Sequence, residues 1–428
     1  MSQIFIGLTD TWYLGKLEGN GPLASMAQSG VIYLIVFLIF SSCFMGIQSL
    51  TARRYGEQDD EACGIVFNNG LVLQIAIGLL VGLLGVTLMD DIVQLVFAGN
   101  PKIEAVLPLA SGYLEIRVGG FVVVSLLWAF RGFFYGIGIT RPDIWAGVVM
   151  NVLNIALNHA LVLGNFGCPK LGVDGAAWAS VIATAVVAVG MVGLAMQSRY
   201  RVTYGLFRLR GFSFKIIKAI LKLSAPRALQ AVAFGGSIYF FKVISDECGE
   251  TALASSIIVW RVLGIMVMTG LAFGAAAGTL LGQSLGAKDP ELAERYGWAA
   301  ARIGFGFNAS LGLFGFLFPA AIIGVFTDDP EVIELGTAPL RLVVVFGCLD
   351  AVGIILARAL SAAGATMYVM YAEIVVSIGA VIPFLLLVQK FLPGNLTAIW
   401  SAWVVYMVAW FSLMAYKFRT GSWKSIKI

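Results

Sequence analysis

Charged residues are scarce in this 428-residue chain. Lys, Arg, Asp and Glu together make up 12% of it, whereas hydrophobic residues make up 59%. Soluble globular domains carry roughly 25% charged residues, so this chain lacks the polar side chains that a water-facing surface needs. The shortage excludes a soluble globular protein. Stretches such as GLVLQIAIGLLVGLLGVTL (70–88) indicate a polytopic helical membrane protein instead.

Residues that bind metals or carry out catalysis are also few. The five cysteines (Cys43, Cys63, Cys168, Cys248 and Cys348) have no C-x-x-C spacing, so we expect small buried side chains rather than a metal or redox site. His159 is the only histidine and has no nucleophile motif beside it, which argues against an enzyme. No stretch has the phosphate-binding loop spacing. We therefore expect no cofactor and no nucleic-acid partner.

Apolar runs divide the chain into twelve predicted membrane spans. They lie near 2–16, 24–49, 64–89, 107–132, 144–164, 173–197, 217–244, 252–280, 299–325, 337–361, 368–390 and 396–416. All but the first are long enough to cross about 30 Å of hydrocarbon at about 1.5 Å per helical residue. The sequence thus predicts an all-α protein with twelve transmembrane helices and the lipid bilayer as its surroundings.

Basic residues predict the orientation of these spans. The even-numbered loops and the C-terminal tail hold eighteen Lys and Arg residues, and the odd-numbered loops hold five. Cytoplasmic loops carry the excess of positive charge. We therefore expect both termini in the cytoplasm and the protein in the cell (inner) membrane.

The chain repeats itself at an offset of 230 residues. Leu23-Ala24-Ser25 aligns with Leu253-Ala254-Ser255, and ARRYGEQDDE (52–61) aligns with GQSLGAKDPE (282–291). YGIGIT (135–140) also resembles SAAGAT (361–366). Six spans in each half predict two lobes that are related by a pseudo-two-fold axis along the membrane normal. The lobes are 1–197 and 217–416, with a basic linker at 198–216 and a basic cytoplasmic tail at 417–428. Because two lobes supply both walls of a cavity, we expect a functional monomer.

The same offset makes the first span look short. Met1 aligns with Ala231, so residues 217–230 have no counterpart in the first half. Either an upstream segment precedes Met1 or the first helix is partial. We expect the former, with the first helix N-terminally truncated in this sequence.

Four stretches carry a resemblance to a known family. They are DTWYLGKL (10–17), RGFFYGIGITRPDIWAGVVMNVLNIALNHALVLG (131–164), LGVDGAAWASVIAT (171–184) and GQSLGAKDPELAERYGWAA (282–300). Together they resemble the multidrug and toxic compound extrusion (MATE) family of the MOP flippase superfamily, nearly from end to end. The resemblance implies a secondary antiporter. Its two lobes would expose a cavity alternately and export organic compounds, often cationic and amphipathic, in exchange for H⁺ or Na⁺.

Asp10 lies in an otherwise apolar stretch. A carboxylate at a helix centre costs about 2.5–3.5 kcal/mol on insertion scales, so an intramembrane acid is a functional hypothesis by default. The alternative is a helix-end residue that is hydrogen-bonded to a neighbour. The MATE family has an ion-coupled aspartate at the matching place, so we favour a coupling role for Asp10.

Three further residues are candidates in the first lobe. Asn154 and Asn158 are i, i+4 on the fifth span and share a face, where they could also serve as interhelical contacts. By resemblance, this helix faces the same pocket as Asp10. One branch of the family has an aspartate where this chain has Asn158, so the site lacks one carboxylate. Ser180 matches a hydroxyl position on the sixth span, or else it is a small packing residue.

Asp350, in the tenth span, is the candidate of the second lobe. It matches a cation-binding aspartate of another MATE branch, but the glutamate of that branch corresponds here to Phe234. One incomplete site per lobe favours proton coupling or a weak Na⁺ site, at Asp10 or Asp350, over a strong one. Gln28 and Gln230 could offer hydrogen bonds to a substrate. Glu373 is interpreted as structural, and Glu115 and Arg117 as a pair.

Two alternative functions remain open. A lipid-linked saccharide flippase of the same superfamily would share the lobe repeat, with extra spans and a basic lumen. A passive channel is less consistent with a repeated two-lobe chain that has no selectivity-filter segment. The preferred prediction is the antiporter.

Overall fold

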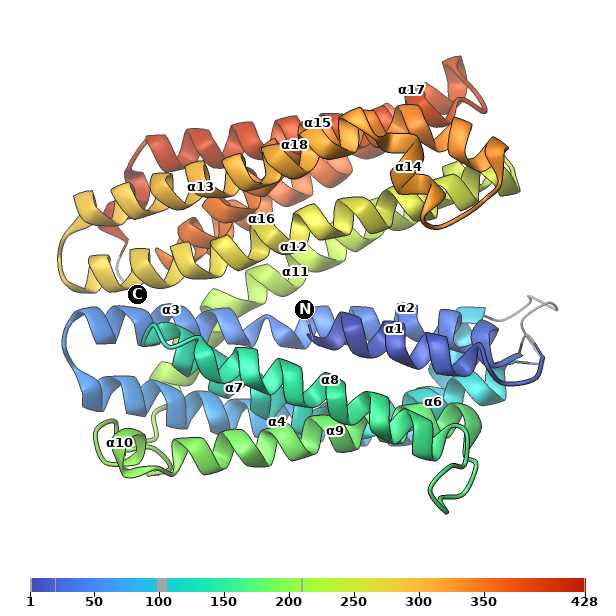
Figure 1. Ribbon diagram of the computed structural model, residues 1–428. Coiled ribbons are helices and arrows are strands. Elements are labelled where there is room, and N and C mark those ends of the chain that lie inside the picture. The colour runs from blue at the N-terminus through green and yellow to red at the C-terminus, as the bar shows by residue number, and fades with distance from the viewer. Residues whose placement is uncertain (1, 20, 98–105, 209–210, 427) are drawn as a thin grey trace. The chain divides into compact units, whose positions relative to one another are not determined.

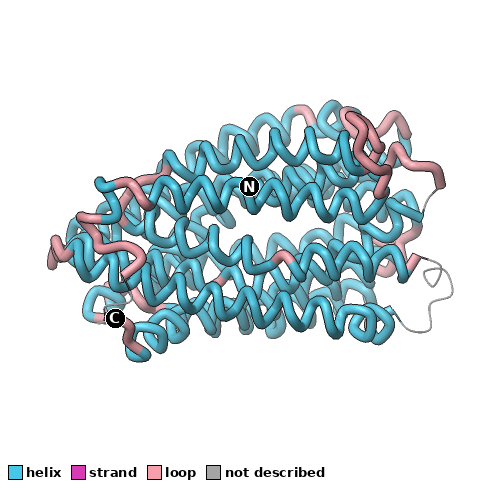
Figure 2. The backbone as a smooth tube through the Cα atoms, turned by 90° about the horizontal axis from the view of Figure 1, so that it is seen from below, coloured by secondary structure: helices cyan, strands magenta, loops and turns pink. Residues whose placement is uncertain are grey.

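The structure is a computed structural model that describes residues 2–19, 21–97, 106–208, 211–426 and 428. Helices make up nearly all of it, and no strand occurs in these described ranges (Figure 2). Hydrocarbon offers no hydrogen bonds, so a spanning segment must satisfy its backbone N–H and C=O groups internally, as a helix does. The prediction of an all-α multi-pass membrane protein is confirmed.

In the described residues of the first half, the six predicted spans correspond to eight helical segments, and a ninth, α10, lies in the predicted linker (Figure 1). These are α1 (Ser2–Leu14), α2 (Gly21–Ser41), α3 (Cys43–Gly56), α4 (Asp60–Phe97), α6 (Leu107–Gly119), α7 (Phe121–Gly136), α8 (Arg141–Leu161), α9 (Gly172–Ala195) and the short α10 (Ser198–Arg201). α2 and α3 follow each other across Ser42, and α6 meets α7 at Gly120 with a bend of 43°. Each of these two pairs corresponds to a single predicted span.

The second half also contains interrupted helices. Its segments are α11 (Phe214–Asp246), α12 (Glu250–Gly286), α13 (Pro290–Leu317), α14 (Pro319–Gly324), α15 (Pro330–Ala362), α16 (Thr366–Ile374), the π-helical η1 (Val375–Val381), α17 (Ile382–Phe391), α18 (Leu396–Arg419) and the 3₁₀ turn η2 (Ser422–Ser425). The described residues hold ten helices long and apolar enough to span a bilayer, or eleven with the bent α6–α7 pair. Together with α1, these segments are consistent with the predicted twelve-helix topology.

The chain divides into two compact units. The first unit comprises Met1–Thr51 and Asp59–Leu221, and the second comprises Ala52–Gln58 and Lys222–Ile428. In the first unit, buried side chains such as Leu114 and Phe121 pack α6 and α7 against α4. In the second unit, α12, α13, α15 and α18 pack around one large core that includes Trp400 and Trp403.

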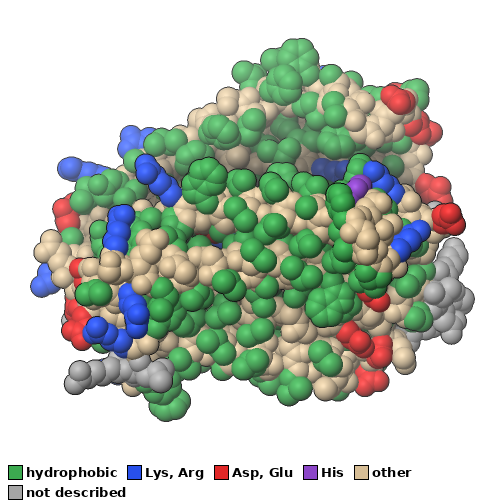
Figure 3. All heavy atoms as spheres, turned by 60° about the horizontal axis from the view of Figure 1, so that its bottom comes forward, with side chains coloured by type: hydrophobic (Ala, Val, Ile, Leu, Met, Phe, Trp, Pro, Cys, Tyr) green, Lys and Arg blue, Asp and Glu red, His purple; other side chains and the backbone are tan. Residues whose placement is uncertain are grey.

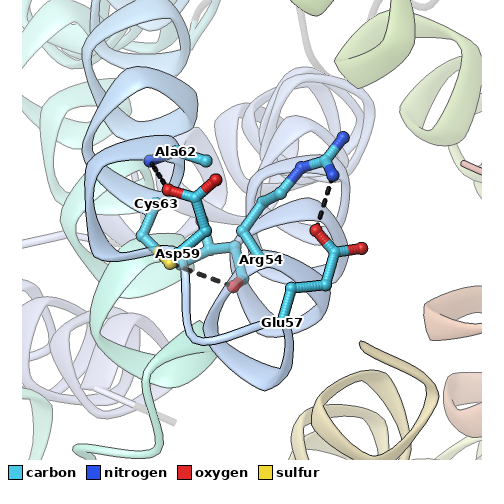
Figure 4. A network of polar contacts seen from close by, with 6 residues as sticks. Arg54, Glu57, Asp59, Ala62 and Cys63 are labelled. Atoms are coloured by element: carbon cyan, nitrogen blue, oxygen red, sulfur yellow. Dashed lines mark hydrogen bonds and ion pairs between the residues drawn. The ribbon is translucent and has the colours of Figure 1, made fainter. Parts of the chain in front are cut away.

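The repeated sequence motif recurs as a repeated turn. Before α4, Gln58 has a φ of 60°, and the Asp59 carboxylate caps the helix by accepting from the Ala62 N–H at 2.8 Å (Figure 4). Before α13, Lys288 has a φ of 61°, and Asp289 accepts from the Leu292 N–H at 2.8 Å. Figure 4 also shows the ion pair between Arg54 and Glu57 in the first of these turns. The 230-residue offset therefore pairs residues that have the same local geometry.

A second turn also recurs. Gly138, after α7, has a φ of 80°, and Gly364, after α15, has a φ of 99°. Only glycine adopts such values without strain. The residue after each glycine donates its N–H to a carbonyl five residues earlier, at 2.8 Å for Ile139 and 2.9 Å for Ala365. The similar motifs YGIGIT and SAAGAT thus form the same helix-ending turn.

Candidate functional site

Asp10 is fully buried at the centre of a polar network in the first unit. Its Oδ1 accepts hydrogen bonds from Asn158 Nδ2 at 2.9 Å and from Asn154 Nδ2 at 3.2 Å. Its Oδ2 accepts from Ser180 Oγ at 2.7 Å and from the Tyr113 hydroxyl at 3.3 Å. Four donors from α6, α8 and α9 therefore converge on one carboxylate of α1.

The helices place these donors by simple spacing and close packing. Asn154 and Asn158 lie one turn apart on α8, and the Asn158 amide also donates to the backbone carbonyl of Asn154 at 2.9 Å. Asn154 reaches Ser180 Oγ at 3.2 Å. A Cβ at Gly175 would lie 2.6 Å from the Leu161 carbonyl oxygen, so only glycine lets α9 start this close to the end of α8. The structure thus brings together all four first-lobe residues that the sequence suggested.

The two amides retain unused oxygens. The Oδ1 atoms of Asn154 and Asn158 are buried and have no hydrogen-bond partner among the described residues. A buried amide oxygen without a partner costs free energy, so a ligand that donates to it or is coordinated by it would be bound favourably. Both oxygens of the Asp10 carboxylate therefore accept hydrogen bonds, whereas the amide oxygens of Asn154 and Asn158 can still accept one each.

Arg117 adds a positive charge near this site that the sequence pattern does not indicate. Its guanidinium lies over the Tyr33 ring, 4.3 Å from the centroid, and its side chain is buried. Within the described part of the chain the Nε atom has no hydrogen-bond partner, and the positive charge acts on Asp10. The expected pairing with Glu115 is wrong: residues two apart on a helix point to different faces, and no ion pair within 4.0 Å joins these two described side chains.

Glu373 is the centre of a comparable network in the second unit. Its Oε1 accepts from Ser377 Oγ at 2.8 Å and from the Tyr406 hydroxyl at 3.1 Å. Its Oε2 accepts from Gln230 Nε2 at 2.9 Å, and the positive charge of the half-buried Arg227 acts on the carboxylate. The only sign of this cluster in the sequence is an acidic residue within an apolar run, which by itself is equally typical of a structural group.

Asp350 is buried on α15 in the same unit. No described residue forms a hydrogen bond with its Oδ1, and Asp350 lies within electrostatic range of Glu373. Phe234 packs instead against Trp403 and Tyr406, with ring centroids 5.9 Å and 5.6 Å apart. The second unit therefore holds two neighbouring acids. Glu373 is surrounded by hydrogen-bond donors, whereas the Oδ1 atom of Asp350 has none among the described residues.

Of the two glutamines that the sequence offers as substrate contacts, only Gln230 has a described side chain. Gln230 uses its amide on Glu373, as described above. Gln28 belongs to α2, but its side chain lies outside the described part of the structure.

Comparisons with known proteins bear on the whole chain. The family model MatE matches residues 1–159 and 226–387. The chain is 26% identical to "Probable multidrug resistance protein NorM" of Thermotoga maritima, over 99% of this chain and 89% of that relative. It is also 26% identical to "Multidrug resistance protein PmpM" of Pseudomonas aeruginosa, over 83% of this chain and 74% of the relative.

Solved structures share the fold. A MOP superfamily transporter from Pyrococcus furiosus, described as having a binding pocket of reverse polarity, superposes with a TM-score of 0.89 at 20% identity, over 100% of this chain and 93% of that one. A multidrug resistance MATE family transporter in an outward-facing conformation also gives 0.89, at 21% identity and the same coverage. The family match covers well over half of the sequence and includes the segments that carry Asp10, Asn154 and Asn158. The chain belongs to the MatE family, the multidrug and toxic compound extrusion transporters that its motifs resemble.

Proposed function

We propose that this transporter is a secondary antiporter that exports organic compounds, often cationic and amphipathic, in exchange for an ion. Relatives named as multidrug resistance proteins support the substrate class. The observation that carries the exchange mechanism is the fully buried Asp10 carboxylate with four converging donors. The family match does not favour the saccharide flippase.

The Asp10 network is suited to a charged carboxylate. Hydrogen bonds from amides and hydroxyls to an ionised acceptor are stronger than those to a neutral one. When Asp10 takes up a proton, one of its oxygens becomes a donor and faces groups that also donate. At least one contact to Asn154, Asn158, Ser180 or Tyr113 must then break or turn. Proton binding at Asp10 thereby favours a different packing of α1 against α6, α8 and α9, which is the coupling step that we propose.

We propose H⁺ as the coupling ion, because Na⁺ is held by several oxygen acceptors, whereas the groups that contact the Asp10 carboxylate donate to it. Arg117 opposes the binding of either ion, because each would place positive charge near the buried guanidinium. The amide oxygens of Asn154 and Asn158 have free lone pairs that suit Na⁺, so a weak Na⁺ site at Asp10 is the alternative. Asp350 is the corresponding proposed group of the second unit. No cofactor beyond the ion is needed, and we propose a functional monomer in the inner membrane.

Uptake of a fluorescent organic cation into proteoliposomes tests the proposal. A pH gradient or a Na⁺ gradient is imposed on vesicles that contain the wild type, Asp10→Asn or Asn158→Ala. The matched control is Asn151→Ala, because Asn151 lies on α8 but donates to Gly147 of its own helix. We expect accumulation under the pH gradient, its loss in Asp10→Asn, a reduced rate in Asn158→Ala and a normal rate in the control.

Two outcomes would contradict the proposal. Transport by Asp10→Asn at the wild-type rate would remove Asp10 from the coupling step. No movement of the cation under either gradient, with folded protein, would overturn the antiporter itself.

A further inference from the structure

A groove runs along α8 and α9 in the first unit, away from the Asp10 network. Its volume is about 790 Å³, and it begins at the turn that contains Gly138. The first half of α8 and the second half of α9 form its two walls, and Arg199 and Tyr200 of α10 close one end. Because α8 begins at Arg141, directly after the loop, this end of the groove lies at a membrane interface.

The groove is apolar along its length. Val187 and Met191 are buried in its floor, whereas Trp145 and Val186 of its walls are 68% and 48% exposed. Gly190 widens it, because a Cβ at this position would meet no atom of the described residues within 4 Å. Hydrophobic side chains also cover the middle of the face in Figure 3, and charged ones lie toward its ends. Such walls fit a hydrocarbon chain and not a soluble polar molecule.

The end of the groove at the membrane interface is positively charged. Arg141 and Arg199 both line the groove and are exposed. The acid nearest to them in sequence, Asp143, already pairs with Arg131 and accepts from the Tyr135 hydroxyl at 2.8 Å. Among the described residues, neither Arg141 nor Arg199 has an acidic partner within 4.0 Å. The two guanidiniums are therefore available to an anion.

We propose that this groove binds an anionic phospholipid. The headgroup phosphate lies between Arg141 and Arg199, and one acyl chain follows Trp145, Val186 and Gly190. Basic pockets between transmembrane helices are suited to anionic headgroups, since each basic side chain near the surface contributes about a fivefold gain in affinity. A lipid fits this site because its acyl chain matches the apolar walls and its phosphate matches the two arginines at the end.

Native mass spectrometry and thermal unfolding in a neutral detergent test this site without any transport assay. Phosphatidylglycerol and phosphatidylcholine with the same acyl chains are compared, and glycerol phosphate is the soluble headgroup probe. We expect tighter binding and a larger rise in Tm with phosphatidylglycerol. The double variant Arg141→Gln/Arg199→Gln should weaken its binding about 25-fold, to the level of phosphatidylcholine.

Two matched controls separate the site from general charge and stability effects. Arg201→Gln/Arg208→Gln removes the same charge from nearby exposed positions that do not line the groove, and should bind as the wild type does. Gly190→Leu fills the groove and should block the lipid. Gly193→Leu enters open space on the same helix and should not.

Three results would overturn the proposal. Equal binding of the two lipids would show that charge does not select the ligand. Equal losses in the Arg141/Arg199 and Arg201/Arg208 variants would show that the groove is not the site. A full Tm rise with glycerol phosphate alone would identify a soluble-anion site instead of a lipid site.

Discussion

Asp10 and Glu373 are both buried carboxylates, and different donor groups stabilise each of them. A carboxylate removed from water loses several kcal/mol of solvation, and hydrogen bonds to both of its oxygens offset that loss. Asp10 takes its donors from two amides and two hydroxyls, and Glu373 takes its donors from one amide and two hydroxyls. In each case a partly or fully buried arginine lies near enough to stabilise the negative charge. Each unit therefore maintains one well-satisfied acid.

Removal of the Glu373 carboxylate should destabilise the second unit. Glu373→Leu leaves the donors of Gln230, Ser377 and Tyr406 without their acceptor, and each unpaired buried group costs about 1–3 kcal/mol. Glu373→Gln keeps one acceptor oxygen and should cost less. Thermal unfolding of the purified proteins measures this, and Tm should fall in the order wild type, Glu373→Gln, Glu373→Leu. If the Leu variant is as stable as the wild type, the network contributes nothing to stability.

Arg117 should weaken the binding of a coupling ion in the first unit. Arg117→Gln removes the positive charge that acts on Asp10 and leaves the amide oxygens of Asn154 and Asn158 in place. We expect uptake by this variant to reach half of its maximum at a lower concentration of H⁺ or Na⁺, because either ion then binds without repulsion from the guanidinium, whereas Arg117→Lys keeps the wild-type value. Uptake into proteoliposomes over a series of pH values and Na⁺ concentrations measures the shift. An unchanged half-maximal concentration in Arg117→Gln would separate ion binding from this charge.

The helix-capping aspartates should matter equally in the two repeated turns. Asp59 and Asp289 each accept from the backbone N–H three residues later, and loss of such a cap costs about 1 kcal/mol. Asp59→Ala and Asp289→Ala should therefore lower Tm by similar amounts. Asp328→Ala is the control, because the neighbouring Asp329 caps α15 instead. A fall in only one of the two cap variants would show that the turns differ in energy despite their shared geometry.

Hydropathy located the helices well but not their interruptions. The spans predicted at 144–164 and 396–416 contain most of α8 and α18, because the apolar composition directly reflects the length of hydrocarbon to be crossed. The run predicted at 368–390 instead contains α16, the π-helical Val375–Val381 and α17. Pro383 lacks an N–H group, so the turn before it cannot keep the regular bonding pattern. Periodicity alone does not report that change of register.

The candidate sites show a similar limit. The motifs of the resemblance contain Asp10, Asn154, Asn158 and Ser180, and one shared face of α8 brings Asn154 and Asn158 to the same carboxylate. Glu373 and Arg117 lie outside such motifs. Their importance depends on which side chains of other helices face them, and one sequence carries no record of those contacts. The predicted roles of Asp350, Gln28 and Gln230, and the predicted lobe boundaries, stay predictions.

At the scale of the whole molecule, the excess of basic residues in alternate loops predicts the orientation. Phe166, between α8 and α9, is 82% exposed, and Gln197 follows the other end of α9 and is also exposed. The 24 residues of α9 span about 36 Å, so the two positions face opposite sides of a bilayer. In a cysteine-free background, a membrane-impermeant maleimide added to intact cells should label Phe166→Cys at once. Gln197→Cys should react only after permeabilisation.

The loops of the second unit provide an independent control for this orientation. Asp328→Cys, between α14 and α15, should react from outside like Phe166→Cys, and Lys288→Cys, between α12 and α13, should behave like Gln197→Cys. Both halves must agree, because an even number of spans in the first half brings the second half into the membrane with the same direction. The reverse pattern at all four positions would place the termini outside. If the two positions of one half were labelled in the opposite order to those of the other half, six spans per half would be wrong. The parallel repeat on which the two-lobe mechanism depends would then be wrong as well.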